Sequence, residues 1–313
     1  VAMSNCVFVT DAVLQMNGDL SAEFVDCVVT NTHDSRVCNY DYTGETTLTN
    51  YTALVKVRQG DGGFGYDACR GDGQDVRFSL GDGEELPSEA GVWNPGGTSE
   101  FWVKLPELKP QTRILMYWGN AAAGPRGDTE KAWNGYAGVW HLDESEGTAN
   151  DTTGHGLDGA PSGEAAAQMV VTNDAVIGGG RGNVNAGDGT GSYLLVPSYN
   201  AHCNGTHFTA SGFFKLTSDR WPGSTGAVYP RLFSRGAADW NTSDWFVNLS
   251  SAPGSYSLRG TGVEVTTVSG GPLLTNTWAH FTVVYDDTLA SLYVDGTLLG
   301  AGTVTDPIST PLT

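Results

Sequence analysis

Short runs of alternating apolar and polar residues recur along the chain, separated by glycine-rich turns. In the N-terminal half, YTALVKVRQ and QDVRFSL alternate in this way, and EFWVKLPEL and TRILMYWGN are also strand-like. A period of two residues is typical of a β-strand with one buried face, and the intervening GDGQD and GDGEE supply turn residues. This half therefore predicts a set of short strands.

Strand-like segments continue from about Trp133 onward, at intervals of roughly eight to twelve residues. They include GSYLLVPSYN, FTASGFFKLTS, YPRLFSRG, DWFVNLS, TWAHFTVVYDD and ASLYVDGTLLGAG. The chain has 313 residues, enough for two domains, and its 43 glycines and 13 prolines interrupt most windows in which a helix could form. The predicted fold class is all-β, with a β-sandwich followed by a jelly roll.

The N-terminal segment contains a short internal repeat. NCVFVT at 5–10 recurs as DCVVTN at 26–31, a period of 21 residues. Such a period resembles the last coils of a right-handed parallel β-helix, and an ordinary hairpin with chance similarity is the alternative. In a solenoid, Cys6 and Cys27 would lie one strand spacing apart, roughly 4.8 Å, whether or not they form a disulfide. The rest of the solenoid would lie upstream, so we expect this chain to be part of a longer polypeptide.

The segment after this repeat contains motifs in a recognisable order. LTNYTALVKV, the stretch from GDGQD to KLPEL, and ILMYWGNAAA resemble an uncharacterised bacterial β-sandwich family of unknown function. In that family the sandwich precedes a laminin-G-like module, and the resemblance implies no activity. We expect an N-terminal β-helix-like segment at 1–36, the sandwich at 37–123, a linker at 124–132 and the second module at 133–313.

The C-terminal motifs resemble the laminin-G or concanavalin A-like jelly roll. GVWHLDE, FTASGFFK, LFSRG and LYVDGTLLG carry the resemblance. It implies that Val139, Trp140 and Leu142 form a first strand that is buried against the sandwich core. The family has a further strand after LYVDGTLLG, with an Asp-Glu pair and an aromatic residue, and this chain stops at TDPISTPLT without it. We therefore expect that the final strand is either missing or supplied from elsewhere.

Charge and cysteine content exclude several classes of protein. The formal net charge is −19, which opposes binding to nucleic acid or an anionic membrane. No apolar run reaches the roughly 18 residues of a membrane span, and no signal peptide begins at Val1. The five cysteines form no CxxC pair, so neither a zinc ribbon nor a disulfide framework is indicated. We expect an extracellular or bacterial cell-surface protein.

The stretch GVWHLDESEGTANDTTGHGLDG at 138–159 concentrates acidic residues in a glycine-rich segment. Glycan hydrolases need two carboxylates on one face of a cleft, and Glu144 and Glu146 could share a strand face. The expected strand, however, ends near Leu142, and no Glu-x-Asp-x-Glu pattern occurs. We expect this stretch to be scaffold, with its acids projecting into solvent or toward a cation.

A calcium loop is the alternative use of the same stretch. Ca²⁺ takes six to eight oxygen ligands from carboxylates and carbonyls. The resemblance to laminin-G-like modules implies a Ca²⁺ site here, with Asp151 as the first candidate ligand and Asp143 and Asp158 beside it. Asp151 could instead cap the turn TTGHG.

Aromatic residues between 221 and 245 suggest a ligand. Exposed rings with flanking hydrogen-bonding groups are typical of sugar-binding surfaces, and the candidates are Trp221, Tyr229, Arg231 and Trp240. The sequence favours a non-catalytic binding or adhesion module that recognises a polysaccharide or surface glycan. A glycan hydrolase with a loop-assembled site and a purely structural adhesin stalk are the alternatives.

Overall fold

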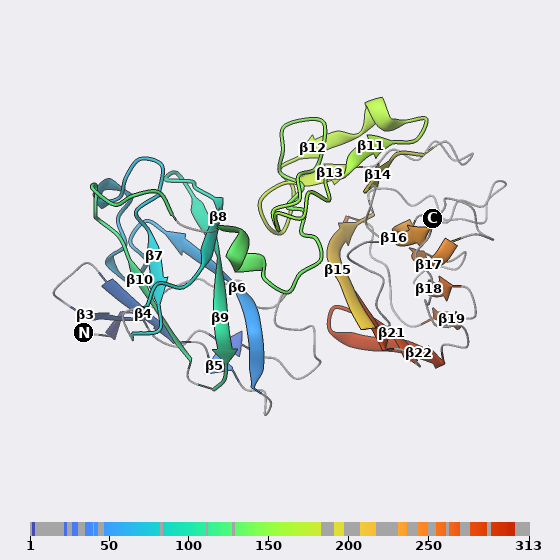
Figure 1. The fold of residues 1–313 in the computed structure, drawn as a ribbon, viewed down its shortest axis with the longest axis horizontal. Helices are drawn as coiled ribbons and strands as arrows, with labels where there is room; N and C mark the ends of the chain where they lie inside the picture. The colour runs from blue at the N-terminus through green and yellow to red at the C-terminus, as the bar shows by residue number, and fades with distance from the viewer. Residues whose placement is uncertain are drawn as a thin grey trace. The chain divides into compact units, whose positions relative to one another are not determined.

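The fold is known from a computed structural model. It describes residues 2–3, 22–23, 27–30, 35–39, 41–42, 47–81, 84–110, 112–126, 129–182, 191–196, 207–216, 231–236, 243–249, 255–260, 263–269, 276–286 and 289–303. The chain forms two compact units (Figure 1). The first unit comprises Val1–Asp143, Asn150–Gly156 and Ile177–Gly179, and the second comprises Glu144–Ala149, Leu157–Val176 and Gly180–Thr313. Nearly all of the regular structure is β, which confirms the predicted fold class.

Two antiparallel sheets make up most of the first unit. A five-stranded sheet has the order β1-β3-β4-β10-β7, a three-stranded sheet has the order β6-β9-β8, and β2 pairs with β5. The strands are β1 (Ala2–Met3), β2 (Ala22–Glu23), β3 (Cys27–Thr30), β4 (Ser35–Asn39), β5 (Asp41–Tyr42), β6 (Leu48–Arg58), β7 (Arg77–Ser79), β8 (Ser88–Val92), β9 (Thr98–Leu108) and β10 (Arg113–Tyr117). Three short 3-10 helices accompany them, η2 (Asp61–Gly63), η3 (Tyr66–Ala68) and η4 (Thr129–Trp133).

The N-terminal strands join the sandwich. β3 pairs antiparallel with both β1 and β4, whereas successive coils of a solenoid pair in parallel. Cys27 begins β3 opposite Cys38, and Cys6 lies outside the described residues. The expected spacing between Cys6 and Cys27 therefore stays a prediction, and the pairing of the described strands is that of a hairpin.

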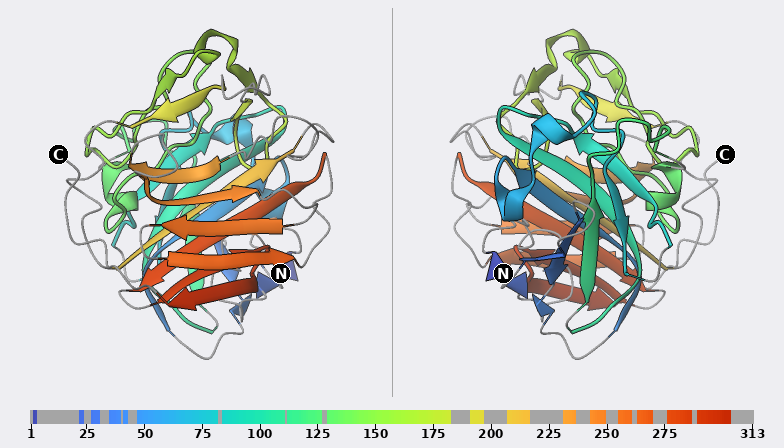
Figure 2. Two further views of the ribbon diagram at one scale, coloured as in Figure 1. Left: turned by 90° about the vertical axis from the view of Figure 1, so that its right-hand side faces the viewer. Right: turned by 90° about the vertical axis from the view of Figure 1, so that its left-hand side faces the viewer.

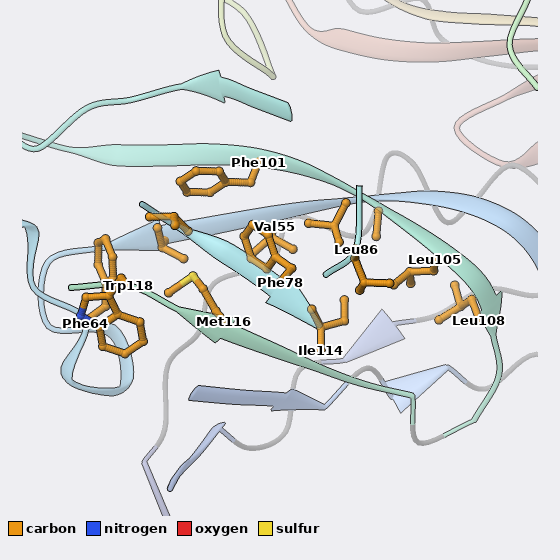
Figure 3. Close-up of a cluster of buried hydrophobic side chains, with 14 of the residues drawn as sticks. Val55, Phe64, Phe78, Leu86, Phe101, Leu105, Leu108, Ile114, Met116 and Trp118 are labelled. Carbon is orange, nitrogen blue, oxygen red and sulfur yellow. The ribbon is translucent and has the colours of Figure 1, made fainter. Parts of the chain in front are cut away.

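The core of the first unit lies between its two sheets. Alternate residues of β6 and β9, such as Val55 and Phe101, point toward Phe78 of β7 and Ile114 of β10 (Figure 3). These side chains are at most 1% exposed. The period of two in the sequence therefore marks the buried face correctly, because side chains alternate between the two faces of a strand.

One glycine in the turn before β7 is required by packing. Gly73 has φ of 66°, and a Cβ at this position would lie 2.4 Å from the Trp93 ring. Trp93 in turn donates from Nε1 to the Gly71 carbonyl oxygen at 2.9 Å. The GDGQD sequence thus serves both the turn and the close approach of an indole ring.

The opposite face of the three-stranded sheet is also buried. Trp102 of β9 packs with Trp133 of η4, with ring centroids 5.1 Å apart. On the same face Lys56 and Glu100 form an ion pair at 2.7 Å, with both side chains 9% exposed. Lys104 donates to the Asn134 carbonyl oxygen at 2.6 Å, and burial lowers the pKa of Lys104 to about 8. Residues after 129 cover this face.

The Glu89 side chain of β8 contacts three residues of the segments that cover this face. Its carboxylate accepts hydrogen bonds from Trp133 Nε1 at 2.5 Å and Thr152 Oγ1 at 2.5 Å, and it lies 3.1 Å from His141 Nε2. The His141 ring stacks on Trp102 with centroids 5.9 Å apart. Burial by itself raises the pKa of Glu89, but the hydrogen bonds and the charge of His141 outweigh it, so the pKa lies below its usual value.

The boundary between the units differs from the expected linker at 124–132. The first unit runs through that stretch to Asp143 and also takes in Asn150–Gly156. The physical reason is the apolar cluster around Leu54 and Trp102, which Trp133, Tyr136 and Val139 help to cover. Residues 133–143 therefore complete the first unit instead of opening the jelly roll.

The second unit contains two four-stranded antiparallel sheets, ordered β15-β20-β21-β22 and β16-β17-β18-β19. Figure 2 shows the latter four side by side in its left view. The strands are β15 (His207–Lys215), β16 (Arg231–Gly236), β17 (Ser243–Leu249), β18 (Ser255–Gly260), β19 (Val263–Ser269), β20 (Trp278–Asp286), β21 (Leu289–Val294) and β22 (Thr297–Thr303). Phe281, Val283 and Leu292 of the first sheet form a core with Leu232 and Phe233 of β16.

A smaller β-rich segment precedes these sheets. β11 (Ala160–Ser162) pairs with β14 (Tyr193–Leu195), and β12 (Val170–Thr172) pairs with β13 (Gly180–Gly182). The 3-10 helix η5 (Ala166–Gln168) lies between β11 and β12 in the sequence. No helix in the described ranges is long and apolar enough to cross a membrane.

Candidate functional site

The residues expected to bind a sugar fall largely outside the described structure. Trp221, Tyr229 and Trp240 are not among the described residues. Arg231 is the first residue of β16 and pairs with Asn248 of β17. The aromatic cluster predicted from the sequence therefore stays a prediction.

The three aspartates expected to bind calcium lie among the described residues. Asp143 and Asp158 are exposed, and Asp151 is half-buried. Across the described ranges, no group of three or more histidine, cysteine, aspartate or glutamate side chains could bind a metal ion. Ca²⁺ also takes backbone carbonyl and water oxygens, so the calcium site stays a prediction.

Asp151 instead caps a turn, which was the alternative interpretation. Its Oδ1 accepts from the Val139 amide at 3.0 Å and the Thr153 amide at 3.1 Å. The Thr153 hydroxyl also donates to this carboxylate at 2.8 Å. An aspartate that bonds to an amide two residues onward forms an Asx-turn, so the TTGHG turn is built on Asp151.

The segment GVWHLDE does not form the expected first strand. Trp140 makes a single isolated bridge to Asp151, and Leu142 has φ of 62°, which is outside the strand region. Glu144 does not project into solvent as expected, because it pairs with Arg181 at 3.1 Å. Sequence resemblance could not show this, since packing on the first unit sets the backbone here.

The outer face of the β15-β20-β21 sheet gathers aromatic and polar side chains. β15 and β20 are in register, so Phe213 lies opposite His280 and Lys215 opposite Trp278. Because side chains alternate, these residues share the face away from the Phe281 core. On β21, Tyr293 lies opposite Thr282 of this same face. We call this set the outer-sheet face: Thr209, Ser211, Phe213, Lys215, Trp278, His280, Thr282 and Tyr293.

Trp278 is fixed by charged neighbours at one end of the outer-sheet face. Lys215 Nζ lies 5.1 Å from the centroid of the Trp278 ring and forms an ion pair with Asp174. Trp278 Nε1 donates to Asp174 Oδ1 at 3.4 Å. The hydrogen bonds from Lys215 and Trp278 lower the pKa of Asp174, so this exposed carboxylate is charged at neutral pH. The indole is therefore oriented, with an acceptor and a cation beside it.

His280 and Phe213 continue the face beside Trp278. Their ring centroids are 4.7 Å apart, and the His280 amide donates to Asp295 Oδ1 at 2.8 Å. Burial lowers the pKa of His280 to about 4, against the opposing effect of Asp295. The imidazole is thus neutral at pH 7. It is only 7% exposed, and its Nδ1 lies 3.5 Å from Thr282 Oγ1, so it supports the neighbouring side chains and is not itself open to a ligand.

This arrangement offers the chemistry of sugar recognition. Aromatic rings cover the C–H face of a sugar ring, and neighbouring hydroxyl, ammonium and carboxylate groups exchange hydrogen bonds with its hydroxyls. The sequence signal for this face was TWAHFTVVYDD, in which Trp278, His280 and Thr282 alternate with the apolar core residues. We read that segment only as a strand.

Comparisons with known proteins agree with the two β units. Residues 188–313 match the concanavalin A-like lectin/glucanases superfamily. Residues 72–156 match a domain of unknown function (DUF2341), a match that runs past the expected linker as the first unit does. No curated protein sequence matches the chain significantly.

Two solved structures show weak likeness. Domain 4 of AbnA, an extracellular GH43 arabinanase from Geobacillus stearothermophilus, in complex with arabinotriose, has a TM-score of 0.36 at 18% identity, covering 51% of this chain and 72% of that one. Trypanosoma rangeli sialidase in complex with the inhibitor DANA has a TM-score of 0.35 at 10% identity, covering 94% of this chain and 49% of that one. The resemblances seen in the motifs are thus confirmed for two segments: a domain of unknown function at 72–156 and a concanavalin A-like domain at 188–313.

Proposed function

We propose that this chain is a non-catalytic carbohydrate-binding module of a secreted or cell-surface protein, and that the outer-sheet face binds the glycan. The observation that carries the proposal is the Trp278 ring, oriented by Lys215 and Asp174. The match of residues 188–313 to a superfamily of lectins and glucanases supports the same ligand class.

The proposed ligand is a neutral polysaccharide. The net charge of −19 repels acidic polymers, whereas a neutral sugar meets no such barrier. Stacking on Trp278 would bury the apolar side of one ring, and Asp174 would accept from its hydroxyls. Tyr293 and the exposed hydroxyl groups of Thr209 and Ser211 would extend the site to neighbouring sugar units.

The state of the acids on this face supports binding over hydrolysis. A glycosidase needs a general acid whose pKa is raised, together with a second carboxylate across the bond. Here the pKa of Asp174 is lowered, and Asp286 pairs with His207 at 2.9 Å. Asp174 is thus held in an ion pair with Lys215, and Asp286 in a contact with His207.

A glycan array followed by calorimetry on the full chain tests this function. We expect neutral oligosaccharides to bind, and Trp278→Ala to weaken the best of them by about tenfold or more, equivalent to about 1.4 kcal/mol. Tyr193→Ala is the matched control, because Tyr193 is an aromatic residue of the second unit that is 44% exposed and lies on β14.

Two outcomes would contradict the proposal. Equal loss of affinity in Trp278→Ala and Tyr193→Ala would remove the outer-sheet face as the site. Mass spectrometry that shows cleavage of the bound oligosaccharide would replace the binding module with a hydrolase.

A further inference from the structure

A separate pocket lies in the second unit. Most of the residues that line it lie between the two family matches, at 157–187. Its volume is about 320 Å³, at the small end for ligand pockets. The apolar part of its lining comes from η5 and β12, and the polar part from β13 and the loop after Glu144. The lining residues that matter here are Ala166, Ala167, Met169, Val171, Glu146 and Arg181.

Arg181 is a buried cation in the lining of this pocket. Its side chain is 4% exposed, and Nη2 pairs with Glu144 at 3.1 Å. Within the described part of the chain, Arg181 Nε–H is buried without a hydrogen-bond acceptor. A buried donor of this kind costs roughly 1–3 kcal/mol. Because β13 pairs with β12, Arg181 lies beside Val171, which also lines the pocket.

The charges around the pocket select against an anion. Arg181 contributes one positive charge, while Glu144 and the exposed Glu146 contribute two negative ones. A carboxylate or phosphate ligand would therefore meet net repulsion. A neutral polyhydroxyl ring can accept from the guanidinium, donate to Glu146 and place its C–H face on Met169.

We propose that this pocket binds a single neutral sugar unit, as a second subsite distinct from the outer-sheet face. The ligand class rests on the proposed function, whereas the location of the subsite is argued from the residues that line the pocket. A pocket of this size takes one sugar unit at the end of a glycan. The chain would then bind a glycan at two points, which increases avidity when both can be engaged.

Saturation-transfer NMR on the full chain tests the subsite. The probes are methyl glycosides of neutral pentoses and hexoses, with methyl glucuronide as the charged comparison. Ala167→Trp fills the pocket from an exposed position and should abolish saturation of the neutral probe. Ala122→Trp introduces the same side chain at an exposed position of the first unit and should leave it unchanged.

A second variant tests the guanidinium. Arg181→Lys keeps the charge beside Glu144 but loses the planar set of donors, so it should weaken the neutral probe while the thermal transition shows that the unit stays folded. Saturation that is unchanged in Ala167→Trp, or stronger for methyl glucuronide than for every neutral probe, would overturn the subsite. If oligosaccharide binding remains sensitive to Trp278→Ala and no methyl glycoside is saturated, the subsite falls and the proposed function stands. If neither signal appears, both fall.

Discussion

Replacing Glu89 tests how residues 129–143 and 150–156 are held against the three-stranded sheet. Replacing it with alanine removes the acceptor shared by Trp133, His141 and Thr152. Each hydrogen bond to a charged group contributes roughly 1.5–3 kcal/mol, and breaking a buried pair by removing one partner costs about 3–5 kcal/mol. The Glu89 and His141 side chains are 15% and 17% exposed, so solvent replaces little of what is lost. We expect Glu89→Ala to lower the free energy of unfolding by about 3–4 kcal/mol.

The assay combines urea unfolding with hydrogen exchange on peptides covering 129–143 and 150–156. These peptides should lose protection first, because Glu89 binds them to the sheet. Glu89→Gln keeps the shape and one acceptor oxygen, and should cost about 1–2 kcal/mol. The control is Glu107→Ala, which removes an exposed ion pair with Lys109 and should cost under about 0.5 kcal/mol.

The pH dependence follows from the lowered pKa of Glu89. A carboxylate with a depressed folded pKa contributes stability above its unfolded pKa of about 4.3, and the contribution is lost as pH falls through the lower folded value. Wild type and Glu89→Ala should therefore converge in acid. The reasoning is refuted if Glu89→Ala lies within about 0.5 kcal/mol of wild type at pH 7.

Three further predictions concern the second unit and the turn at Asp151. Burial lowers the pKa of His280 to about 4, against about 6.5 in the unfolded chain, so the second unit should lose stability as pH falls between those values. His280→Gln should make the melting temperature of the second unit less dependent on pH in this range. A wild-type melting temperature that does not change between these pH values would contradict this. Asp151→Ala should cost about 1–2 kcal/mol of unfolding free energy equally in calcium and in chelator, because its carboxylate caps a turn; a loss seen only in calcium would revive the metal loop. Gly163→Ala should lower the free energy of unfolding, measured by chemical denaturation, far more than Gly147→Ala. Of these two positions, only at Gly163 would a Cβ meet a backbone oxygen, 2.3 Å away. Equal losses of stability in the two variants would show that the backbone moves to accommodate the Cβ.

Alternation in the sequence locates strands and the main core face well. YTALVKVRQ and QDVRFSL contain β6 and β7, with Val55 and Phe78 buried as the pattern predicts. It cannot identify a second buried face built from charged residues. Lys56 and Glu100 look solvated in the sequence, because the segment that covers them is distant along the chain and their pairing depends on that cover.

The sequence predicts a sugar-binding second unit, with the candidate tryptophans in its loops, and these lie outside the described residues. The sequence predicts only a strand at Trp278, because a period of two does not say which face of the strand meets the core. The contacts of Lys215 and Asp174 with Trp278 are tertiary, since Asp174 lies 104 residues from Trp278, and no local pattern indicates them.

The indole N–H resonance of Trp278 gives the most direct test of the central claim. It can be assigned by its absence in Trp278→Phe, and then followed while the full chain is titrated with the oligosaccharide that binds best on the array. We predict a saturable shift of this resonance, because the sugar would contact the indole and perturb its bond to Asp174. A saturable binding curve that leaves the Trp278 resonance in place would contradict the assignment of the outer-sheet face as the glycan site.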